Sequence, residues 1–141
     1  MAERMKGRCL CGAVQFEGTL KDGGEFGVCH CNMCQHWNGG PGLATEMVGM
    51  NISGENHVKW YASSEWAERG FCTGCGSNLF YRLKEVRDLY FVQVGSLDEP
   101  GRLTLAEHIF IDEMPGHYDF TGNAPRLTGA EFLARLQGEQ K

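Results

Sequence analysis

The sequence predicts a mainly β fold with a short C-terminal helix. Most segments alternate apolar and polar residues with the period of two that half-buried strands show. The chain has 20 glycines among its 141 residues, many of them between these runs at turn positions, and helix-length periodic stretches are few. With 42% hydrophobic residues, residues 1–141 are expected to form a single domain.

Seven segments are expected to be strands. Val14 with Phe16, and Val58 with Trp60, supply the β-branched and aromatic bulk that suits a half-buried pleated surface. In chain order, the expected strands are Ala13–Glu17, Gly27–His30, Leu43–Val48, His57–Ala62, Asn78–Leu83, Leu89–Val94 and Glu107–Ile111.

Two segments are expected to be helical. Thr128 and Glu131 have the spacing of a capping box, and apolar residues follow on one face, which predicts an amphipathic helix over Gly129–Gln137. One or two helical turns are expected at Asn32–Trp37. Neither helix is long enough to change the mainly β class.

The seven cysteines fall into three tight clusters. They are Cys9 and Cys11 as C-x-C, Cys29, Cys31 and Cys34 as C-x-C-x-x-C, and Cys72 and Cys75 as C-x-x-C. Clustered soft thiolates are the ligands that Zn²⁺ selects, and seven of them divide into one closed site of four and one open site of three. The sequence therefore predicts two zinc ions.

The closed site is expected to combine the first and last clusters. Cys72 and Cys75, with Gly74 and Gly76, form a C-x-x-C-G knuckle whose backbone amides can donate to the sulfurs. The Cys9 and Cys11 pair supplies the other two ligands. Closing the intervening loop costs about 3–4 kcal/mol of chain entropy. Structural zinc contributes roughly 10–16 kcal/mol, so the closure is offset.

The middle cluster is expected to form the open site. Cys29, Cys31 and Cys34 come from one strand-to-helix segment, and no further cysteine exists to complete a tetrahedron. Three protein ligands with an exchangeable fourth position are typical of catalytic zinc. The alternative is that His30 or His36 closes the site and makes it structural. His36 is the better of the two, because the middle residue of C-x-C points away from the metal.

Other interpretations of the cysteines are open. They could be free buried thiols, or they could hold an iron–sulfur centre, although pair-type clusters with trailing glycines favour zinc. The protein could also be a noncatalytic zinc-stabilised binding module. A third possibility is a zinc-storage or redox-sensing protein that uses the triple cluster.

Charge and composition restrict the partners and the compartment. The formal net charge is -5, and no Lys/Arg-rich stretch is present, so nucleic acid is not an expected partner. An odd number of cysteines argues against a disulfide framework, and no apolar run suits a signal peptide or a membrane span. We therefore expect a cytoplasmic protein that does not bind membranes.

The clusters and two later segments carry a resemblance to a known family. The segments are Gly7–Val14, Cys29–Gln35, Phe71–Ser77, Gly95–Pro100 and His108–Phe110. Over about residues 7–118 the chain resembles the glutathione-dependent formaldehyde-activating enzyme (GFA) family. The segment Met114–Tyr118 departs from the family's usual pattern, which changes the expected pocket wall and bears on the substrate.

The resemblance implies a fold, two zinc ions and an activity. The fold is one of packed, twisted antiparallel sheets stabilised by zinc. By position, Cys9, Cys11, Cys72 and Cys75 would hold the structural ion, and Cys29, Cys31 and Cys34 the catalytic one. The activity is that of a carbon–sulfur lyase on the adduct of formaldehyde with glutathione, or with another small thiol.

Other polar residues are weaker candidates for the site. For proton transfer the candidates are His30, His36, His108 and His117, each of which can equally be an ordinary surface or core histidine. Arg69 and Arg82 are candidates to meet the carboxylates of glutathione, and a solvated sheet edge explains these two residues equally well.

Overall fold

The computed structural model describes residues 3–139 and confirms the mainly β prediction. The chain divides into two compact units. Unit 1 comprises the chain up to Glu25 together with Ala44–Thr104, and unit 2 comprises Phe26–Leu43 together with the chain from Leu105 onward. No helix among residues 3–139 is long and apolar enough to span a membrane.

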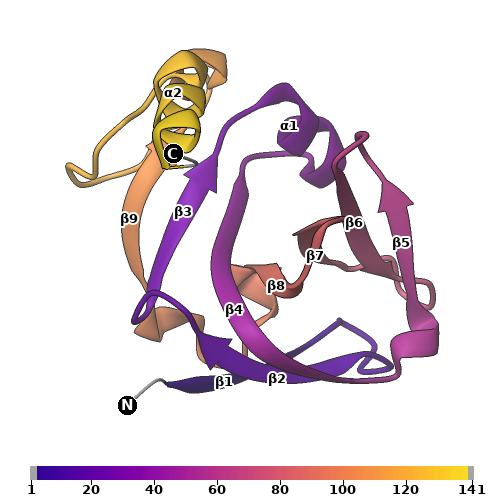
Figure 1. The fold of residues 1–141 in the computed structure, drawn as a ribbon. Helices are drawn as coiled ribbons and strands as arrows, with labels where there is room; N and C mark the ends of the chain where they lie inside the picture. The colour runs from indigo at the N-terminus through magenta and orange to yellow at the C-terminus, as the bar shows by residue number, and fades with distance from the viewer. Residues whose placement is uncertain (1–2, 140–141) are drawn as a thin grey trace. The chain divides into compact units, whose positions relative to one another are not determined.

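Unit 1 is built on an antiparallel sheet (Figure 1). Its strands are β1 (Arg4–Arg8), β2 (Gln15–Leu20), most of β4 (Gly42–Ser53), β5 (Val58–Ala62), β6 (Ala67–Cys72), β7 (Asn78–Leu83) and β8 (Val86–Gln93). They lie in the order β1-β2-β4-β8-β7-β6-β5, and every neighbouring pair is antiparallel. Short 3₁₀ turns at Glu55–His57, Val94–Ser96 and Pro100–Arg102 complete the unit.

The core of unit 1 is an aromatic cluster. The ring of Phe80 lies edge-on to Phe16, with centroids 5.1 Å apart, and stacks on Trp60 at 5.9 Å. Gly70 leaves room for this indole, because a Cβ there would lie 3.0 Å from the Trp60 ring. The period-two pattern of the sequence therefore gives the buried face of the sheet.

Unit 2 contains a strand pair and both α-helices. Strand β3 (Glu25–Cys29) pairs with β9 (Thr104–Ile109), and the helices are α1 (Asn32–Asn38) and α2 (Gly129–Glu139). A 3₁₀ turn at Ile111–Glu113 follows β9.

The predicted capping box of α2 is present. The amide of Glu131 donates to Thr128 Oγ1 at 3.1 Å, and the amide of Thr128 donates to the Glu131 carboxylate at 2.8 Å. Arg135 then makes two hydrogen bonds, of 2.7 and 2.6 Å, to the carboxylate of Glu107 in β9. These contacts attach α2, drawn in yellow in Figure 1, to unit 2.

Two strands were not expected from the sequence. In β1 the exposed Arg4, Lys6 and Arg8 alternate with Met5 and Gly7, so a single large apolar side chain marks the strand. In β6, Glu68 and Arg69 are buried, which hides the strand from a hydrophobic pattern. Burial by tertiary partners overrides the polarity of these residues.

Strand boundaries also differ from those predicted, although β7 matches its predicted bounds. Strand β9 ends at Ile109 rather than at Ile111, because Phe110 adopts a positive φ of 54°. Strand β4 continues to Ser53, five residues beyond the expected Val48, with Gly49 at a positive φ of 61° inside it.

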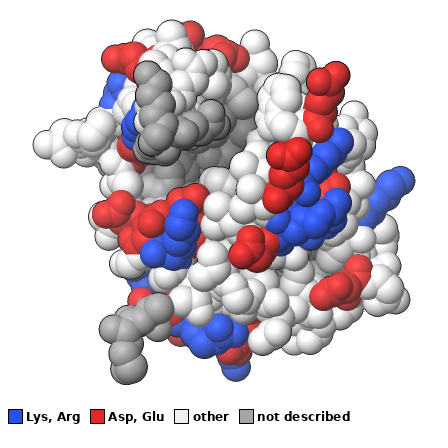
Figure 2. Space-filling view, viewed as in Figure 1, with Lys and Arg blue, Asp and Glu red and all other residues white. Residues whose placement is uncertain are grey.

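Charged side chains of both signs are interspersed on the face drawn in Figure 2.

Candidate metal centres

The first candidate centre lies in unit 1. The sulfurs of Cys9, Cys11, Cys72 and Cys75 all lie within 4.8 Å of one another. The Sγ atom of Cys11 is 3.6 Å from that of Cys9 and 3.8 Å from that of Cys72. Four sulfurs at about 2.3 Å from a tetrahedral zinc ion are separated by about 3.8 Å, so the spacing fits this metal.

Backbone amides orient the sulfurs of this cluster. The amide of Val14 donates to Cys9 Sγ, and that of Gly74 donates to Cys72 Sγ, each at 3.3 Å. Gly76 has a φ of 79°, which only glycine adopts readily, and its amide donates to the carbonyl of Cys72 at 2.7 Å. Amide donors of this kind stabilise thiolates and therefore a bound cation.

Ser77 joins the two halves of the cluster, a role that sequence reasoning missed. Its hydroxyl lies 3.2 Å from Cys75 Sγ and accepts a hydrogen bond from the Leu10 amide at 3.0 Å. Hydrogen bonds from the Ser77 hydroxyl and from backbone amides lower the pKa of Cys75 to about 5. This thiolate is available to a metal at neutral pH.

The second candidate centre lies in unit 2. Cys29 ends β3, Cys31 is the N-cap of α1, and Cys34 lies in the first turn, with all three sulfurs within 4.8 Å of one another. The Cys34 amide donates to Cys31 Sγ at 3.4 Å. Gly42 is buried beside this cluster, and a Cβ there would lie only 3.3 Å from Cys34 Sγ.

The pKa values of Cys29 and Cys31 in this centre are shifted in opposite directions. Hydrogen bonds from Cys29 and Cys34, followed by backbone amides, lower the pKa of Cys31 to about 2. The same contacts, together with burial, raise the pKa of Cys29. The cluster therefore holds a thiolate, which is the form of cysteine that binds a metal.

No histidine or carboxylate completes this second cluster in the part of the chain that the structure describes. Within residues 3–139, no His, Asp or Glu donor atom lies within 4.8 Å of all three sulfurs. His36 is exposed on α1. Both ring nitrogens of His30 have other partners, Tyr118 and His108. The cluster thus presents three protein sulfurs, as its spacing in the sequence predicts.

His30 and His108 meet in the interior of unit 2. His30 Nε2 lies 2.9 Å from His108 Nδ1, and both side chains are almost fully buried. Burial lowers the pKa of each ring, and the Arg126 charge acts in the same direction on both, so neutral imidazoles are favoured. His117, another candidate for proton transfer, is exposed.

Arg69 and Arg82, candidates either to meet carboxylates of glutathione or to line a solvated sheet edge, both have partners inside unit 1. Arg82 donates to the Glu68 carboxylate at 2.7 Å, and its guanidinium lies 3.7 Å from the centroid of the Trp60 ring. Arg69 is buried with its guanidinium over Tyr81. Both arginines are occupied inside unit 1, because aromatic and acidic partners compensate their burial.

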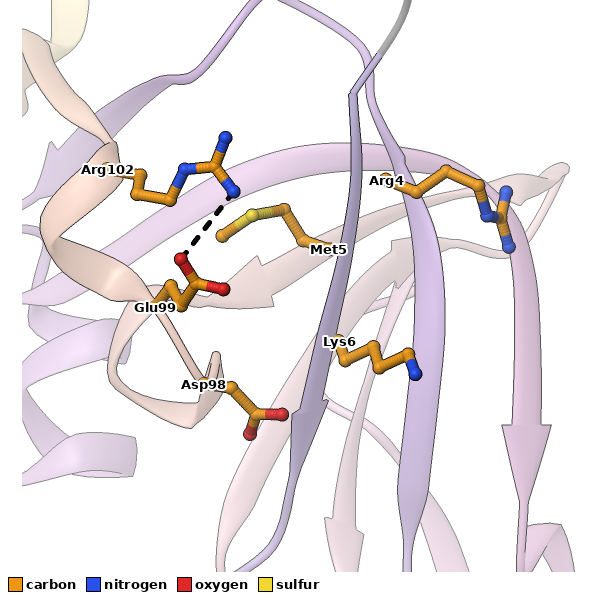
Figure 3. A pocket seen from close by; sticks show the side chains of 6 residues that line it. All are labelled: Arg4, Met5, Lys6, Asp98, Glu99 and Arg102. Carbon is orange, nitrogen blue, oxygen red and sulfur yellow. Dashed lines mark ion pairs between the residues drawn. The ribbon is translucent and has the colours of Figure 1, made fainter.

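Unit 1 has a cavity of about 300 Å³. Its lining side chains, drawn in Figure 3, are those of Arg4, Met5, Lys6, Asp98, Glu99 and Arg102. Arg102 lies 3.6 Å from Glu99, and both Arg4 and Lys6 pair with Glu17. Each cation of the lining therefore has a glutamate partner.

Fold and sites together define a class: a β-rich protein with two cysteine clusters suited to metal ions. The family model described as "Glutathione-dependent formaldehyde-activating enzyme" matches residues 4–113. The chain therefore belongs to this family, as the sequence resemblance predicted.

Individual relatives agree with this assignment. An uncharacterised lyase of Schizosaccharomyces pombe is 29% identical over 132 residues, which cover 93% of this chain and 96% of the relative. A putative glutathione-dependent formaldehyde-activating enzyme of Halomonas elongata is 31% identical over 85 residues, or 54% of each protein. The crystal structure of a Rhodobacter sphaeroides protein shares the fold, with a TM-score of 0.55 and 21% identity over 86% of this chain and 99% of that one.

Proposed function

We propose that this protein is a zinc-dependent carbon–sulfur lyase that acts on the adduct of a small thiol, such as glutathione, with an aldehyde, such as formaldehyde. Family membership and the names of the two relatives support glutathione-related aldehyde chemistry and an enzyme. The observation that carries the proposal is the set of three sulfurs, from Cys29, Cys31 and Cys34, with no fourth donor from the described residues.

The donor set fits zinc at both centres. Cys9, Cys11, Cys72 and Cys75 provide four sulfurs at tetrahedral spacing, so this centre would be structural. Cys29, Cys31 and Cys34 would hold the second ion. When bound there, zinc supplies a Lewis acid that lowers the pKa of a thiol or polarises a carbonyl oxygen.

The reaction itself moves few atoms. In one direction the thiolate sulfur bonds to the aldehyde carbon, and the carbonyl oxygen takes up a proton. In the other direction the carbon–sulfur bond breaks, and the thiol and aldehyde separate. The chain contributes a fixed site: the Cys34 amide orients the Cys31 sulfur, and Gly42 leaves space beside the Cys34 sulfur.

Two broader features belong to the same proposal. The family match includes segments of both units, which supports one GFA-like domain over residues 1–141. All seven cysteines are free thiols, which suits a reducing compartment and supports a cytoplasmic location. We propose that the protein binds neither nucleic acid nor membranes.

Metal analysis combined with a kinetic assay tests the proposal. Two zinc ions per chain are expected, together with acceleration of formaldehyde exchange with glutathione above the spontaneous rate, measured by exchange NMR. Cys31→Ser should lose one ion and the acceleration. A zinc-replete wild-type protein that gives only the spontaneous rate with glutathione and with other small thiols would contradict the lyase proposal.

A redox-sensing role is the second candidate, because the three sulfurs of the open cluster lie close together and are partly exposed. It predicts rapid oxidation by peroxide with release of one zinc ion and no acceleration of adduct exchange. Zinc that stays bound under peroxide would exclude it.

A further inference from the structure

A partly buried chain of hydrogen bonds in unit 2 includes His30, the residue between Cys29 and Cys31. It links Gln35 of α1, Tyr118, His30 and His108 of β9. We propose that Tyr118, His30 and His108 are positioning residues that fix the segment between Cys29 and Cys31 and thereby set the metal affinity of this cluster. The inference rests on the proposed zinc site and deepens it.

His30 occupies the middle position of the C-x-C segment. The sulfurs of Cys29 and Cys31 converge with that of Cys34, whereas the His30 ring is fully buried against Tyr118 and His108. Successive side chains of an extended segment point to opposite sides, so an anchor on His30 also fixes the two sulfurs beside it.

Every polar group of His30 has a partner. Its amide donates to the Ile109 carbonyl at 3.1 Å, and its carbonyl accepts from Gln35 Nε2 at 3.4 Å. Its ring nitrogens lie 2.9 Å from the Tyr118 hydroxyl and from His108 Nδ1. A residue held at four points has little freedom to move its neighbours' sulfurs.

One proton arrangement satisfies the whole chain. Gln35 Nε2 faces the His30 carbonyl, so it is a donor, and the Tyr118 oxygen accepts its second hydrogen bond at 2.5 Å. The Tyr118 hydroxyl then donates to His30 Nδ1, and His30 Nε2–H donates to His108 Nδ1. All members are neutral in this arrangement, as suits a buried network.

The far end of the chain is also fixed. The amide of His108 donates to the Pro125 carbonyl at 2.8 Å, and its carbonyl accepts from Leu127 at 2.9 Å. Phe120 lies edge-on to both imidazoles, with centroids 5.8 and 5.1 Å away. Backbone hydrogen bonds and the contact with Phe120 therefore hold His108 in place.

Tyr118 and Phe120 lie beyond the part of the chain that the family model matches, which ends at residue 113. Tyr118 ends the segment Met114–Tyr118, where the sequence departs from the family pattern, and Phe120 follows two residues later. This chain therefore supports a metal cluster of the matched region with side chains from its own C-terminal segment.

Tyr118→Phe provides the direct test. It keeps the stacked ring but removes the hydroxyl, so that His30 Nδ1 loses its partner and Gln35 Nε2 keeps only the His30 carbonyl. Tyr90→Phe is the matched control, because it removes a half-buried hydroxyl that bonds to Arg82 in unit 1. Zinc affinity is measured on the full chain by competition with a chromogenic chelator. The binding step that is lost from this titration in Cys31→Ser is assigned to the three-cysteine site.

Tyr118→Phe should weaken zinc at the three-cysteine site about tenfold or more, and should shift the visible absorption of Co²⁺ bound there. Zinc at the four-cysteine site should be unchanged, and Tyr90→Phe should alter neither site. His108→Leu should reproduce the loss. His108→Asn, which keeps an acceptor near the Nδ1 position, should recover most of the affinity.

Unchanged affinity and Co²⁺ absorption in Tyr118→Phe would overturn the inference. So would equal weakening of both metal sites, or equal losses in His108→Leu and His108→Asn. If Tyr118→Phe fails to fold, the comparison of the two His108 variants decides. Metal binding is measured without substrate, so the two proposals can fail separately. If the variants change zinc affinity and Co²⁺ absorption as expected but the wild type shows no turnover, only the lyase proposal is contradicted. If the wild type shows turnover but the variants leave zinc affinity and Co²⁺ absorption unchanged, only the positioning role is contradicted.

Discussion

The two cysteine clusters are held in place by different means. In unit 1, backbone amides of tight turns, from Val14 and Gly74, donate directly to the sulfurs. In unit 2, the Cys34 amide also donates to Cys31 Sγ, but the cysteine segment is anchored in addition through the side chain of His30, whose partner Tyr118 lies 88 residues further along the chain. In unit 1 each cysteine pair is oriented by amides of its own turn, whereas in unit 2 the orientation of the cysteine segment also depends on side chains from distant parts of the unit.

The clusters also differ in how far they can complete a coordination sphere. The four sulfurs of the first cluster are enough to complete a tetrahedral coordination sphere, and Cys9 and Cys72 are buried within this cluster. Three partly exposed sulfurs form the second. The first arrangement suits stability and the second suits exchange of a ligand.

The largest expected contrast is between Cys72→Ser and Cys31→Ser. Cys72→Ser removes a buried ligand of the structural site, so it should cost about 5 kcal/mol or more of unfolding free energy. Cys31→Ser should cost less than about 2 kcal/mol, because serine can still cap α1 by accepting from the Cys34 amide. Denaturant unfolding followed by circular dichroism measures both. Equal destabilisation would contradict the division of roles.

On treatment with a chelator, the two sites should release their zinc ions at different times. The three-sulfur site should release zinc first, because a chelator can attack an incomplete coordination sphere directly. Most of the loss in thermal stability should accompany release of the second ion. A time course of zinc release, with a melting curve at each point, checks this order. Simultaneous release would mean that the clusters are coupled or equally closed.

Two glycine substitutions should sharpen the contrast further. In Gly42→Ala the new Cβ would lie 3.3 Å from Cys34 Sγ, so this sulfur must shift, and zinc at the three-cysteine site should bind several-fold more weakly. In Gly74→Ala the closest sulfur, that of Cys11, would be 3.5 Å away, which is ordinary contact. Its zinc affinity should stay within about twofold of wild type. Competition titrations of both variants provide the comparison.

The smallest effect concerns the ion pair that attaches α2 to unit 2. The Arg135 guanidinium lowers the pKa of Glu107, so the pair's stabilisation is present above the ordinary carboxyl pKa and is lost as the pH falls through the lowered value. Glu107→Gln should cost about 0.5–1 kcal/mol at pH 7.

The difference between Glu107→Gln and the wild type should therefore shrink as the pH falls below the ordinary carboxyl pKa, and should vanish once the pH is below the lowered pKa of Glu107. Stability curves of the two proteins at several pH values measure it. A difference that grows as the pH falls would contradict the assigned pKa direction. Glu17→Gln, which removes an exposed carboxylate paired with Arg4 in unit 1, serves as the control.

Much of the fold followed from local patterns. The mainly β class, β7 and the capping box of α2 all agree with the sequence, because alternation and capping act over a few residues. Strand β6 was missed because Glu68 and Arg69 are buried, and only their partners on other strands make that burial possible.

At the candidate metal centres, too, the sequence predicted the cysteines but not the contacts that other side chains make there. Ser77 and Gln35 stand next to the cysteine clusters in the sequence, yet neither has a pattern that reveals its contacts. Tyr118 had one signal, its place in a segment that departs from the family pattern. That signal located a difference without showing which side chain Tyr118 would contact.

By itself the sequence determined the mainly β class and the two sets of cysteines that the structure gathers, because ligand spacing within each cluster is set by a few consecutive residues. Tertiary structure alone decided that Arg69 is buried, that Arg82 pairs with Glu68, and that His30 meets Tyr118 and His108. Those contacts join residues far apart in the chain, and their free energy arises only when folding removes both partners from water.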